Sequence, residues 1–235
     1  MGNLEILPQI KAIESYGLAS NPLENKRGYI GVSICSHFYS KRNIKAIIEW
    51  AADNFNEFLF LVADEPQSYT FMASKGLGYE DSYERAMKIG DEKFISIQRL
   101  IESSGHKNIT IDRWKDVAHN KEFLSVQSKI RECYRTDVYF KNDILKQVQL
   151  RNEHLTTEYE FSMIEASNFD TAALYVLNEI SVMIFLQEIS DKTFPIQIYP
   201  FRMPPALVGL YENIYCNEIK LNKDKSGYIQ IDVDE

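Results

Sequence analysis

The stretch GYIGVSICSHFYSKRNIKAIIEWAADNFNEFLFLVAD occupies residues 28–64 and decides the fold. It begins with a short apolar run at residues 28–33, which is typical of a buried strand. A polar loop follows, then a helix whose apolar residues recur at the spacing of one face, and then a second apolar run at residues 58–64. Strand, helix and strand in this order predict a βαβ unit with parallel strands and a right-handed crossover.

The rest of the chain continues the alternation of helices and strands. We expect residues 1–27 to be a partly irregular lead-in. The other expected elements are a loop with Gly76 and Gly78, a helix at 81–103, a strand at 108–111, a helix at 122–150, a helix from an Asp170 N-cap to about Gln187, a strand at 196–201, a short helix from Ala206, and a half-exposed or edge strand at 227–233. This order favours one Rossmann-like α/β domain over residues 1–235, with a mainly parallel sheet flanked by helices.

Composition restricts the partners and the compartment. Hydrophobic residues make up 45% of the 235 residues, which is enough for one sizeable core. The net charge of -8 disfavours binding of nucleic acid over the whole surface, so contact with an RNA requires a local basic patch. Cys35, Cys133 and Cys216 lie far apart without the spacing of a zinc site, which favours a reduced compartment and no bound metal.

Segments for targeting or membrane insertion are not expected. Residues 1–10 lack the basic segment and the long apolar run of a signal peptide. The strongly apolar stretch Ile180–Leu186 is too short to span a bilayer. We therefore predict a cytoplasmic protein with no membrane partner.

Candidate chemistry lies at the carboxyl ends of the predicted strands, where sites gather in open α/β sheets. Ser33, Asp64 and Tyr199 each finish a strand. Tyr175 and Glu179 are four residues apart on a predicted helix and therefore share one face. A phenol and a carboxylate on one face can hold an ammonium group and move a proton. Each feature also has an ordinary structural interpretation: a turn or cap serine, an aspartate that caps the next element, and a surface pair or a satisfied core hydroxyl.

Common catalytic motifs are missing. The sequence has no GxGxxG or GxxxxGK[ST] loop and no HExxH, and Cys35 stands where a G-x-S-x-G elbow around Ser33 requires glycine. His37, four residues after Ser33, is a candidate base or an ordinary solvated loop histidine. The residues alone therefore leave two further hypotheses, an α/β serine hydrolase or esterase and a non-catalytic Rossmann-type binding module.

Three short blocks, taken in order, resemble the catalytic signatures of cyclodipeptide synthases. The first is Gly31-Val32-Ser33 followed by Ser36, Phe38, Ser40 and Asn43, the second runs from Tyr175 to Glu179, and the third is Tyr199-Pro200. The similarity spans roughly residues 28–205. Many members of that family have Asn where this chain has Ser36, and the subgroup without that Asn typically has Tyr-Pro in the third block, as here.

The resemblance implies a tRNA-dependent aminoacyltransferase that joins the amino acids of two aminoacyl-tRNAs into a cyclic dipeptide. It also implies a fold similar to the catalytic domain of class I tyrosyl- and tryptophanyl-tRNA synthetases. Ser33 would carry aminoacyl and then dipeptidyl esters in a ping-pong reaction. Tyr175 and Glu179 would hold the α-ammonium group. Tyr199 would donate a hydrogen bond or relay a proton.

The same resemblance, with the expected strand positions, defines the surroundings. The substrate pocket is expected to include Tyr29, Gly31, Ser36, Leu61, Ala63, Val182, Gln197 and Pro200. A sparse basic stripe of Arg85, Lys88 and Arg99 is the candidate tRNA-binding surface. No cofactor is expected, and no activation by ATP, because the energy for the reaction already lies in the aminoacyl ester. No metal is expected, because the leaving group is a ribose hydroxyl of modest basicity. A monomer is expected, and the identities of the two amino acids stay open, since pocket walls discriminate by only about 1–3 kcal/mol per methylene.

Overall fold

The computed structural model describes residues 7–17, 27–158, 163–215 and 220–234 of the chain. The strands are β1 (Gln9–Gly17), β2 (Arg27–Ser33), β3 (Glu57–Ala63), β4 (Ile109–Arg113), β5 (Ile196–Tyr199) and β6 (Gly227–Asp234). The α-helices are α1 (Lys41–Asn54), α2 (Gln67–Lys75), α3 (Tyr79–Ser104), α4 (Trp114–Val117), α5 (Lys121–Thr136), α6 (Val138–Glu158), α7 (Phe169–Ile184) and α8 (Pro205–Tyr211). Short turns are η1 (His37–Tyr39), η2 (Ala166–Asn168) and the π-helical turn η3 (Phe185–Ile189).

The strands form a six-stranded sheet in the order β1-β6-β5-β2-β3-β4. All neighbouring pairs are parallel except β1 and β6, which are antiparallel. From β2 the chain moves outward through β3 and β4, and then returns to place β5 on the other side of β2. The strand order therefore reverses between β2 and β5. In open α/β sheets, ligands bind in the crevice outside the carboxyl ends of the strands at such a switch point.

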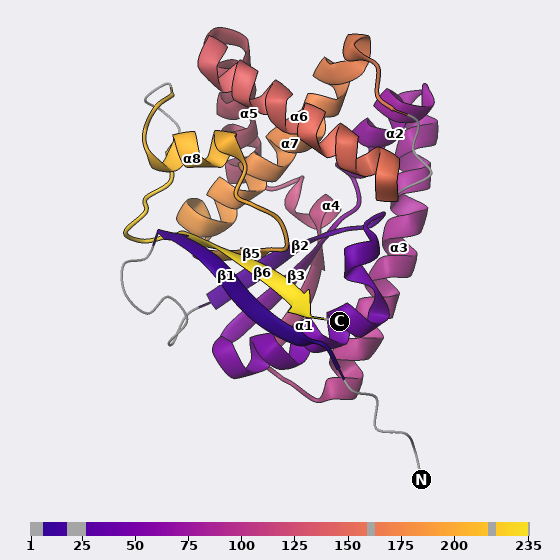
Figure 1. The fold of residues 1–235 in the computed structure, drawn as a ribbon, viewed down its shortest axis with the longest axis vertical. Coiled ribbons are helices and arrows are strands. Elements are labelled where there is room, and N and C mark those ends of the chain that lie inside the picture. Colours follow the sequence, from indigo (N-terminus) through magenta and orange to yellow (C-terminus); the bar gives the residue numbers. More distant parts are fainter. Residues whose placement is uncertain (1–6, 18–26, 159–162, 216–219, 235) are drawn as a thin grey trace.

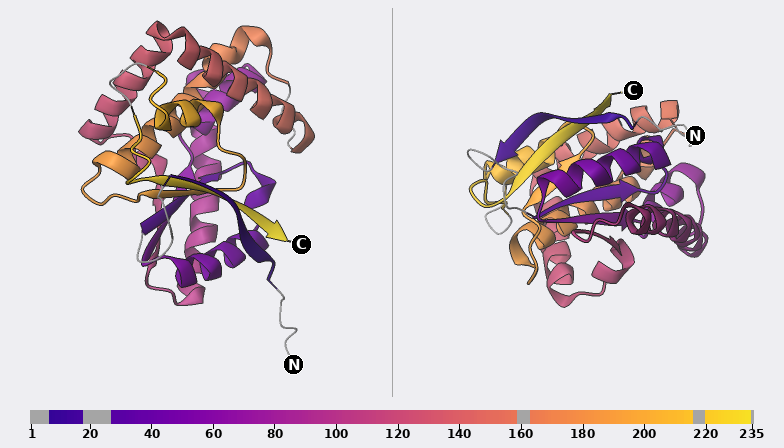
Figure 2. Two further views of the ribbon diagram at one scale, coloured as in Figure 1. Left: turned by 60° about the vertical axis from the view of Figure 1, so that its left-hand side comes forward. Right: turned by 90° about the horizontal axis from the view of Figure 1, so that it is seen from below.

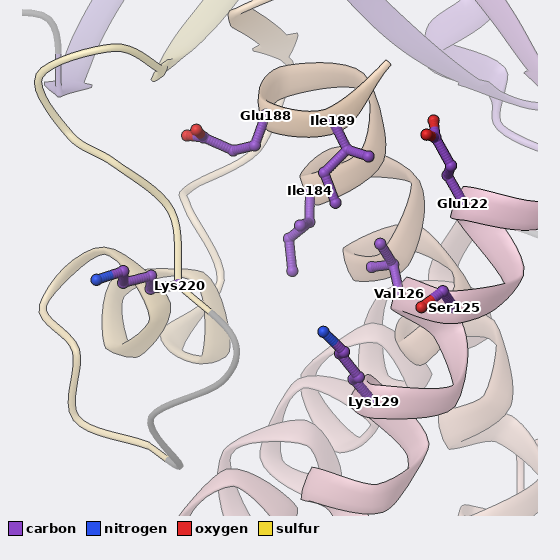
Figure 3. Close-up of a pocket in the computed structure, with 8 residues that line it drawn as sticks. All are labelled: Glu122, Ser125, Val126, Lys129, Ile184, Glu188, Ile189 and Lys220. Carbon is purple, nitrogen blue, oxygen red and sulfur yellow. The ribbon is translucent and has the colours of Figure 1, made fainter.

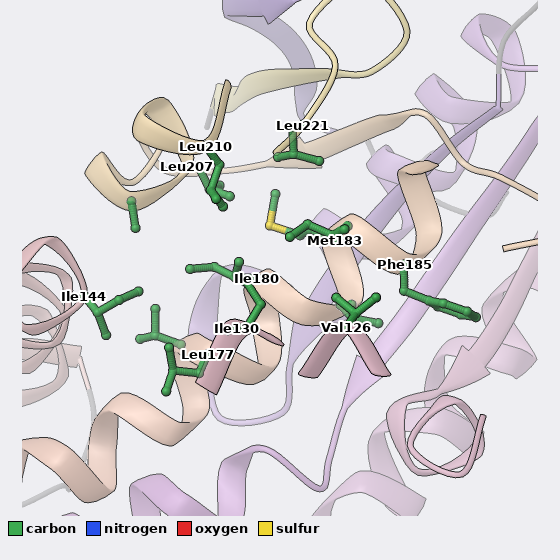
Figure 4. Close-up of a cluster of buried hydrophobic side chains, with 14 of the residues drawn as sticks. Val126, Ile130, Ile144, Leu177, Ile180, Met183, Phe185, Leu207, Leu210 and Leu221 are labelled. Carbon is green, nitrogen blue, oxygen red and sulfur yellow. The ribbon is translucent and has the colours of Figure 1, made fainter. Parts of the chain in front are cut away.

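Two helical layers cover the sheet. Side chains alternate along β2, so Tyr29 packs into one core and Ile30 and Val32 pack into the other. The first core lies under α5, α6, α7 and α8, which gather on one side of the sheet, whereas α1 and α3 cover the other side (Figures 1 and 2). In the first core, apolar side chains from α5, α7 and α8 converge, with Ile180 and Met183 of α7 among them (Figure 4).

A buried ion pair fixes α3 to the sheet. Arg113, at the end of β4, donates from Nε to Oδ2 of Asp64 at 2.6 Å, and it also donates to Asp91 and to the Met87 carbonyl of α3. The helix approaches so closely that a Cβ on Gly90 would lie 2.5 Å from the Cβ of Asp64. Asp64 thus has a structural role. Asp64 does not cap the next helix, α2, whose N-cap is Pro66; its Oδ1 instead accepts from the backbone N–H groups of residues 65 and 115.

Several boundaries differ from the prediction, each for a tertiary or capping reason. The lead-in contains the strand β1, which forms the sheet edge, so the strand at 227–233 is an inner strand and not the edge. The helix expected at 122–150 is two helices, because Asp137 ends α5 and its Oδ1 accepts from the N–H groups of Tyr139 and Phe140 to start α6. Helix α2 was not predicted. Asp170 is not the N-cap of α7, because the helix begins one residue earlier and Asp170 accepts a hydrogen bond from Tyr134.

The segment Ala166–Ile189 is, by length and composition, apolar enough to cross a membrane, but 72% of its most apolar 18-residue window is buried inside the fold. This segment contains α7, which packs against α2, α5 and α6. Packing in the core of the domain is therefore enough to explain why this segment is apolar. The expectation that the apolar stretch here is too short to span a bilayer took only Ile180–Leu186 and missed the length of the whole helix.

Candidate active site

Ser33 is the last residue of β2 and lies beside the switch point. The chain turns immediately after it, because the N–H of Ser36 donates to the Ser33 carbonyl at 3.3 Å. The turn is held to its strand by Tyr39, whose hydroxyl donates to the carbonyl of Gly31 at 2.7 Å. Asn43 also donates to the carbonyl of Phe38 at 2.8 Å. The serine is therefore half-buried at the end of a rigid strand, in a loop with defined geometry.

Open space lies beside Ser33 on the same face of β2. A Cβ on Gly31 would meet no atom within 4 Å, although the flanking residues Ile30 and Val32 are fully buried on the other face. In register, Tyr29 pairs with Gln197 and Ile30 with Ile198, so Gly31 lies opposite the next residue of β5, Tyr199. The space thus lies where a small ligand would contact both β2 and β5.

The predicted pocket residues differ in their burial and position. Tyr29, Leu61, Ala63 and Val182 are buried in the core on this side of the sheet, and Gln197 is buried next to Tyr29 in register. The Gln197 Oε1 and the Ser36 Oγ are buried and have no hydrogen-bond partner in the part of the chain that the structure describes. Pro200 is half-buried, directly after β5. Buried polar atoms without a protein partner are rare, and a polar group of a bound ligand is one partner that would satisfy them.

Tyr175 and Glu179 on α7 and Tyr199 on β5 come together in one cluster. The Tyr175 hydroxyl is hydrogen-bonded to the Glu179 carboxylate, and Tyr199 lies within electrostatic range of both. The cluster also contains Arg151 from α6, whose guanidinium carbon lies 3.4 Å from the centroid of the Tyr175 ring. A phenol, a carboxylate and a guanidinium therefore meet at the face that carries Gly31.

Burial controls the protonation of this cluster. It raises the pKa of Glu179, and the nearby charge of Arg151 and the hydrogen bond from Tyr175 reduce that rise. Burial, together with the charge of Glu179, also raises the pKa of Tyr175 and of Tyr199, so both phenols are neutral donors near neutral pH. Burial lowers the pKa of Arg151, but Tyr175, Glu179 and Tyr199 more than offset this, so the pKa is raised and the guanidinium stays charged. A raised pKa brings the Glu179 carboxylate closer to the range useful for acid–base chemistry.

Two neighbours of Ser33 have different properties. Burial raises the pKa of the Cys35 thiol to about 11, although Arg151, Arg85 and Lys93 oppose the rise. Cys35 is therefore a neutral thiol near neutral pH and a poor nucleophile. His37 is exposed in the η1 turn.

Arg151 is the residue of this cluster that the sequence analysis missed. Phe140, Ile144 and Val148 of α6 are buried and recur every four residues, so the same stripe continues to positions 151 and 152. A charged residue on an apolar stripe is a signal of a buried polar site. The expected helix ended at residue 150 and therefore excluded Arg151.

The basic stripe of α3 is only partly connected to the site. Arg85, Lys88 and Arg99 are all exposed on α3. Of these three, Arg85 is the one whose charge acts on Cys35, and its guanidinium carbon lies 5.0 Å from the centroid of the Phe71 ring on the α1–α3 side of the sheet. Lys93, which was not predicted, is half-buried, donates to the carbonyl of Tyr39 at 3.0 Å and also acts on Cys35. Positive charge thus gathers near the Ser33 loop although the chain as a whole is acidic.

A surface pocket of about 280 Å³ lies elsewhere on the molecule (Figure 3). It is lined by Glu122, Ser125, Val126, Lys129, Ile184, Glu188, Ile189 and Lys220. Ile184 ends α7 nine residues after Tyr175, which is about 13 Å along the helix at 1.5 Å per residue. None of the predicted site residues lines this pocket, so it is separate from the Ser33 site.

Comparison with known proteins places the chain in a family. The sequence model of the cyclodipeptide synthases matches residues 23–232. The chain belongs to the cyclodipeptide synthase family. The cyclo(L-leucyl-L-leucyl) synthase of Staphylococcus haemolyticus is 25% identical over 219 residues, which cover 87% of this chain and 86% of that protein.

Solved structures show the same fold. A cyclodipeptide synthase from Bacillus thermoamylovorans matches with a TM-score of 0.75 at 20% identity, over 94% of this chain and 96% of that one. The synthase of Candidatus Glomeribacter gigasporarum, solved bound to Phe-tRNAPhe, matches with 0.64 at 15% identity, over 90% of each chain. The tyrosyl-tRNA synthetase of Archaeoglobus fulgidus matches with 0.52 at 14% identity, over 88% of this chain and 55% of that one. The predicted α/β fold, shared with class I tRNA synthetases, is confirmed.

Proposed function

We propose that this cyclodipeptide synthase uses two aminoacyl-tRNAs and builds a cyclic dipeptide through aminoacyl and dipeptidyl esters of Ser33. The observation that carries the proposal is the position of Ser33 at the switch point, on the face that also bears the open space at Gly31 and the Tyr175–Glu179–Tyr199 cluster. A hydroxyl, a space and an ammonium-binding pair at one crevice are what acyl transfer of an amino acid requires.

In the first half-reaction, the Ser33 hydroxyl attacks the ester carbonyl of the first aminoacyl-tRNA. A serine ester forms, the bond to the ribose oxygen breaks, and the serine proton ends on that oxygen as the tRNA leaves. The α-ammonium group of the bound residue is held by the Glu179 carboxylate and the Tyr175 hydroxyl, which are hydrogen-bonded to each other. The ester stores the energy of the tRNA ester, so the step needs no ATP.

In the second half-reaction, the dipeptide must stay on Ser33, so the serine-bound residue supplies the attacking amine. That amine has to lose a proton first, and the Glu179 carboxylate is the acceptor. The neutral amine attacks the ester carbonyl of the second aminoacyl-tRNA, an amide forms as the bond to the ribose oxygen breaks, and that oxygen takes up the proton that the amine loses as the second tRNA leaves. The free amine of the dipeptidyl ester then attacks the Ser33 ester, which closes the ring and restores the serine hydroxyl, with Tyr199 donating a hydrogen bond to the reacting carbonyl.

The surroundings take supporting roles in this proposal. Gly31 leaves room for the first side chain, and the other pocket residues named above form its walls. Ser36 followed by Tyr199-Pro200 supports placing the chain in the Tyr-Pro subgroup of the family. The tRNA docks on the exposed basic residues of α3, of which Arg85 acts on Cys35 in the Ser33 loop. The enzyme works as a cytoplasmic monomer without cofactor or metal, in the compartment that supplies charged tRNA.

The direct test is product formation. The chain is expressed in bacteria and the medium is analysed by mass spectrometry for cyclic dipeptides, and the purified enzyme is then supplied with aminoacyl-tRNA without ATP. We expect a cyclic dipeptide in both experiments, and no product when the tRNA is digested with ribonuclease before the assay. Product from free amino acids and ATP without tRNA, or no product with any mixture of charged tRNAs, would overturn the proposal.

A further inference from the structure

Arg151 is a half-buried charged side chain on α6. It lies on the buried stripe of α6, and its guanidinium carbon is 3.4 Å from the centroid of the Tyr175 ring, which is 1% exposed. A cation over an aromatic face is attractive, and the attraction grows when both groups are shielded from water. A charge that is partly withdrawn from water is costly unless it is paired, so the position of Arg151 needs a reason.

We propose that Arg151 is a positioning residue for the reaction proposed above: its guanidinium fixes the ring of Tyr175 and supplies the positive charge that holds Glu179 as a carboxylate. The inference rests on the proposed function, since it assigns Arg151 to the group that binds and deprotonates the amine. Arg151 itself acts through Tyr175 and Glu179 and takes no proton.

The surroundings of Glu179 show why this charge matters. Glu179 interacts with Tyr175 on its own helix, Tyr29 on β2, Tyr199 on β5, Tyr228 on β6, and Arg151 on α6. Four of these five groups are neutral phenols. Among these five groups, which all belong to the described part of the chain, Arg151 is the one that carries a positive charge. Its charge lowers the pKa of Glu179 against the opposing effect of burial.

The geometry also explains why the cation is an arginine. A guanidinium is planar, and it can stack on the Tyr175 ring while its edge N–H groups stay directed to other acceptors. A lysine ammonium is a compact point charge that cannot stack in this way. Arg151→Lys therefore separates the two parts of the proposal, since it keeps the charge and loses the stacking that fixes the ring.

The experiment compares the pH dependence of kcat for cyclic dipeptide formation in three variants. Arg151→Gln removes the charge, Arg151→Lys keeps it, and Lys146→Gln is the control, an exposed basic residue on the same helix. For Arg151→Gln we expect the acidic limb of the profile to move to higher pH. The ratio of kcat at about pH 8.5 to kcat at about pH 6.5 should rise by roughly threefold or more, because loss of an adjacent opposite charge raises a carboxyl pKa.

The other variants make the result specific. Arg151→Lys should keep the acidic limb near its wild-type position but lower kcat at all pH values, and Lys146→Gln should leave both unchanged. The salt dependence of kcat/KM should be the same in all three, since none of these side chains is assigned to phosphate. Thermal unfolding of each variant shows whether it is folded, and Arg151→Lys keeps the test valid if Arg151→Gln does not fold.

Three outcomes would overturn the inference. The first is a wild-type profile and kcat in Arg151→Gln, which would make Arg151 a passive core residue. The second is a flatter salt dependence and a raised KM with an unmoved acidic limb, which would make Arg151 a contact to the tRNA phosphates. The third is an acidic limb in Arg151→Lys displaced as far as in Arg151→Gln, since charge alone should hold it. Failure of the proposed function is distinct, because the wild-type enzyme would then make no cyclic dipeptide at any pH.

Discussion

The two faces of β2 differ in almost every physical property although they alternate along one strand. On the α1–α3 side, Ile30 and Val32 are 0% exposed and packed among apolar side chains. On the α7 side, Gly31 borders open space and Ser33 ends the strand next to a buried ionisable cluster. One face is filled and provides stability, while the other is left incomplete and can accept a ligand. The comparison teaches that stability and chemistry are separated by a single residue step along the chain.

The largest effect on activity is expected at Ser33, and its neighbour Val32 on the other face of β2 is the matched comparison. Ser33→Ala removes the proposed nucleophile and should abolish both product and covalent labelling by radioactive aminoacyl-tRNA, with little change in thermal stability, since the serine is half-buried. Val32→Ala removes two methyl groups from a filled core and should cost about 1–3 kcal/mol of unfolding free energy. Its activity per folded molecule should remain close to wild type.

Peptide mapping of the label decides this prediction. In the wild-type enzyme we expect the label on the peptide that contains Ser33. Label on Cys35, or full product from Ser33→Ala, would remove Ser33 as the nucleophile. Strong loss of activity in folded Val32→Ala would show that the two faces are not functionally separate.

The second-largest effect on activity is expected at Glu179, the proposed acid–base group on the Gly31 side of β2. Glu179→Gln keeps shape and hydrogen bonding but removes the charge, so Ser33 should still be labelled while product formation falls by about 100-fold, the range typical of lost acid–base catalysis. Because burial raises the pKa of Glu179, wild-type kcat should fall as the pH falls through that pKa, since a protonated carboxyl cannot accept the ammonium proton. This acidic limb should vanish in Glu179→Gln. Normal product from the variant would reduce the Tyr175–Glu179 pair to an ordinary contact.

The contrast between the faces also explains what the sequence could reveal. The apolar runs at residues 28–33 and 58–64 predicted the central strands correctly, because buried parallel strands have continuous apolar sequences. The strand ends then placed Ser33 and Tyr199, and the i, i+4 spacing placed Tyr175 beside Glu179. These features depend only on local periodicity and on the general rule for the carboxyl edge of a sheet.

The features that were missed depend on tertiary contacts. Helix α2 packs against both α3 and α7 and buries polar residues, so it has no simple amphipathic pattern. Its serines bond inside the segment, as when Ser74 donates to the Thr70 carbonyl at 2.7 Å. The break at Asp137 is a single cap inside a charged stretch, and the approach of Arg151 to Tyr175 joins helices that no local pattern connects.

An intermediate effect is expected from substituting the two glycines of β2 by alanine. These substitutions test how much space each face of the strand leaves for an added methyl group. A Cβ on Gly28 would lie 2.6 Å from the ring of Phe55, which is itself packed between Trp50 and Phe58. Gly28→Ala should therefore cost about 1–3 kcal/mol by overpacking. Gly31→Ala meets nothing within 4 Å and should leave thermal stability nearly unchanged, while it narrows the proposed substrate space.

Thermal unfolding and product analysis separate these outcomes. The melting temperature should fall by roughly 2–4 °C per kcal/mol in Gly28→Ala and stay close to wild type in Gly31→Ala. The products of Gly31→Ala should shift toward smaller first residues or form more slowly. Equal destabilisation by both substitutions would mean that the space at Gly31 is filled in solution and that the faces do not differ in packing.

The smallest effect is expected outside both faces, on the exposed side of α3. This helix packs on the filled face yet carries Arg85, Lys88 and Arg99 toward solvent. Arg85 and Arg99 are 14 residues apart, which is about 21 Å along the helix at 1.5 Å per residue, and only Arg85 acts on the Ser33 loop through Cys35. Docking of the acceptor end of a tRNA should therefore depend more on Arg85 than on Arg99.

Single and double substitutions measure that difference. Arg85→Ala should weaken the use of aminoacyl-tRNA and reduce the slope of log kcat/KM against log salt by about 1, the contribution of one phosphate contact. Arg99→Ala should change this slope less, and the double variant should resemble Arg85→Ala more than Arg99→Ala. Stability should change by no more than about 0.5 kcal/mol, because both side chains are exposed. An unchanged slope in the double variant would move the docking surface to another patch, such as Lys41, Arg42 and Lys45 at the start of α1, and would leave α3 as a purely structural layer of the filled face.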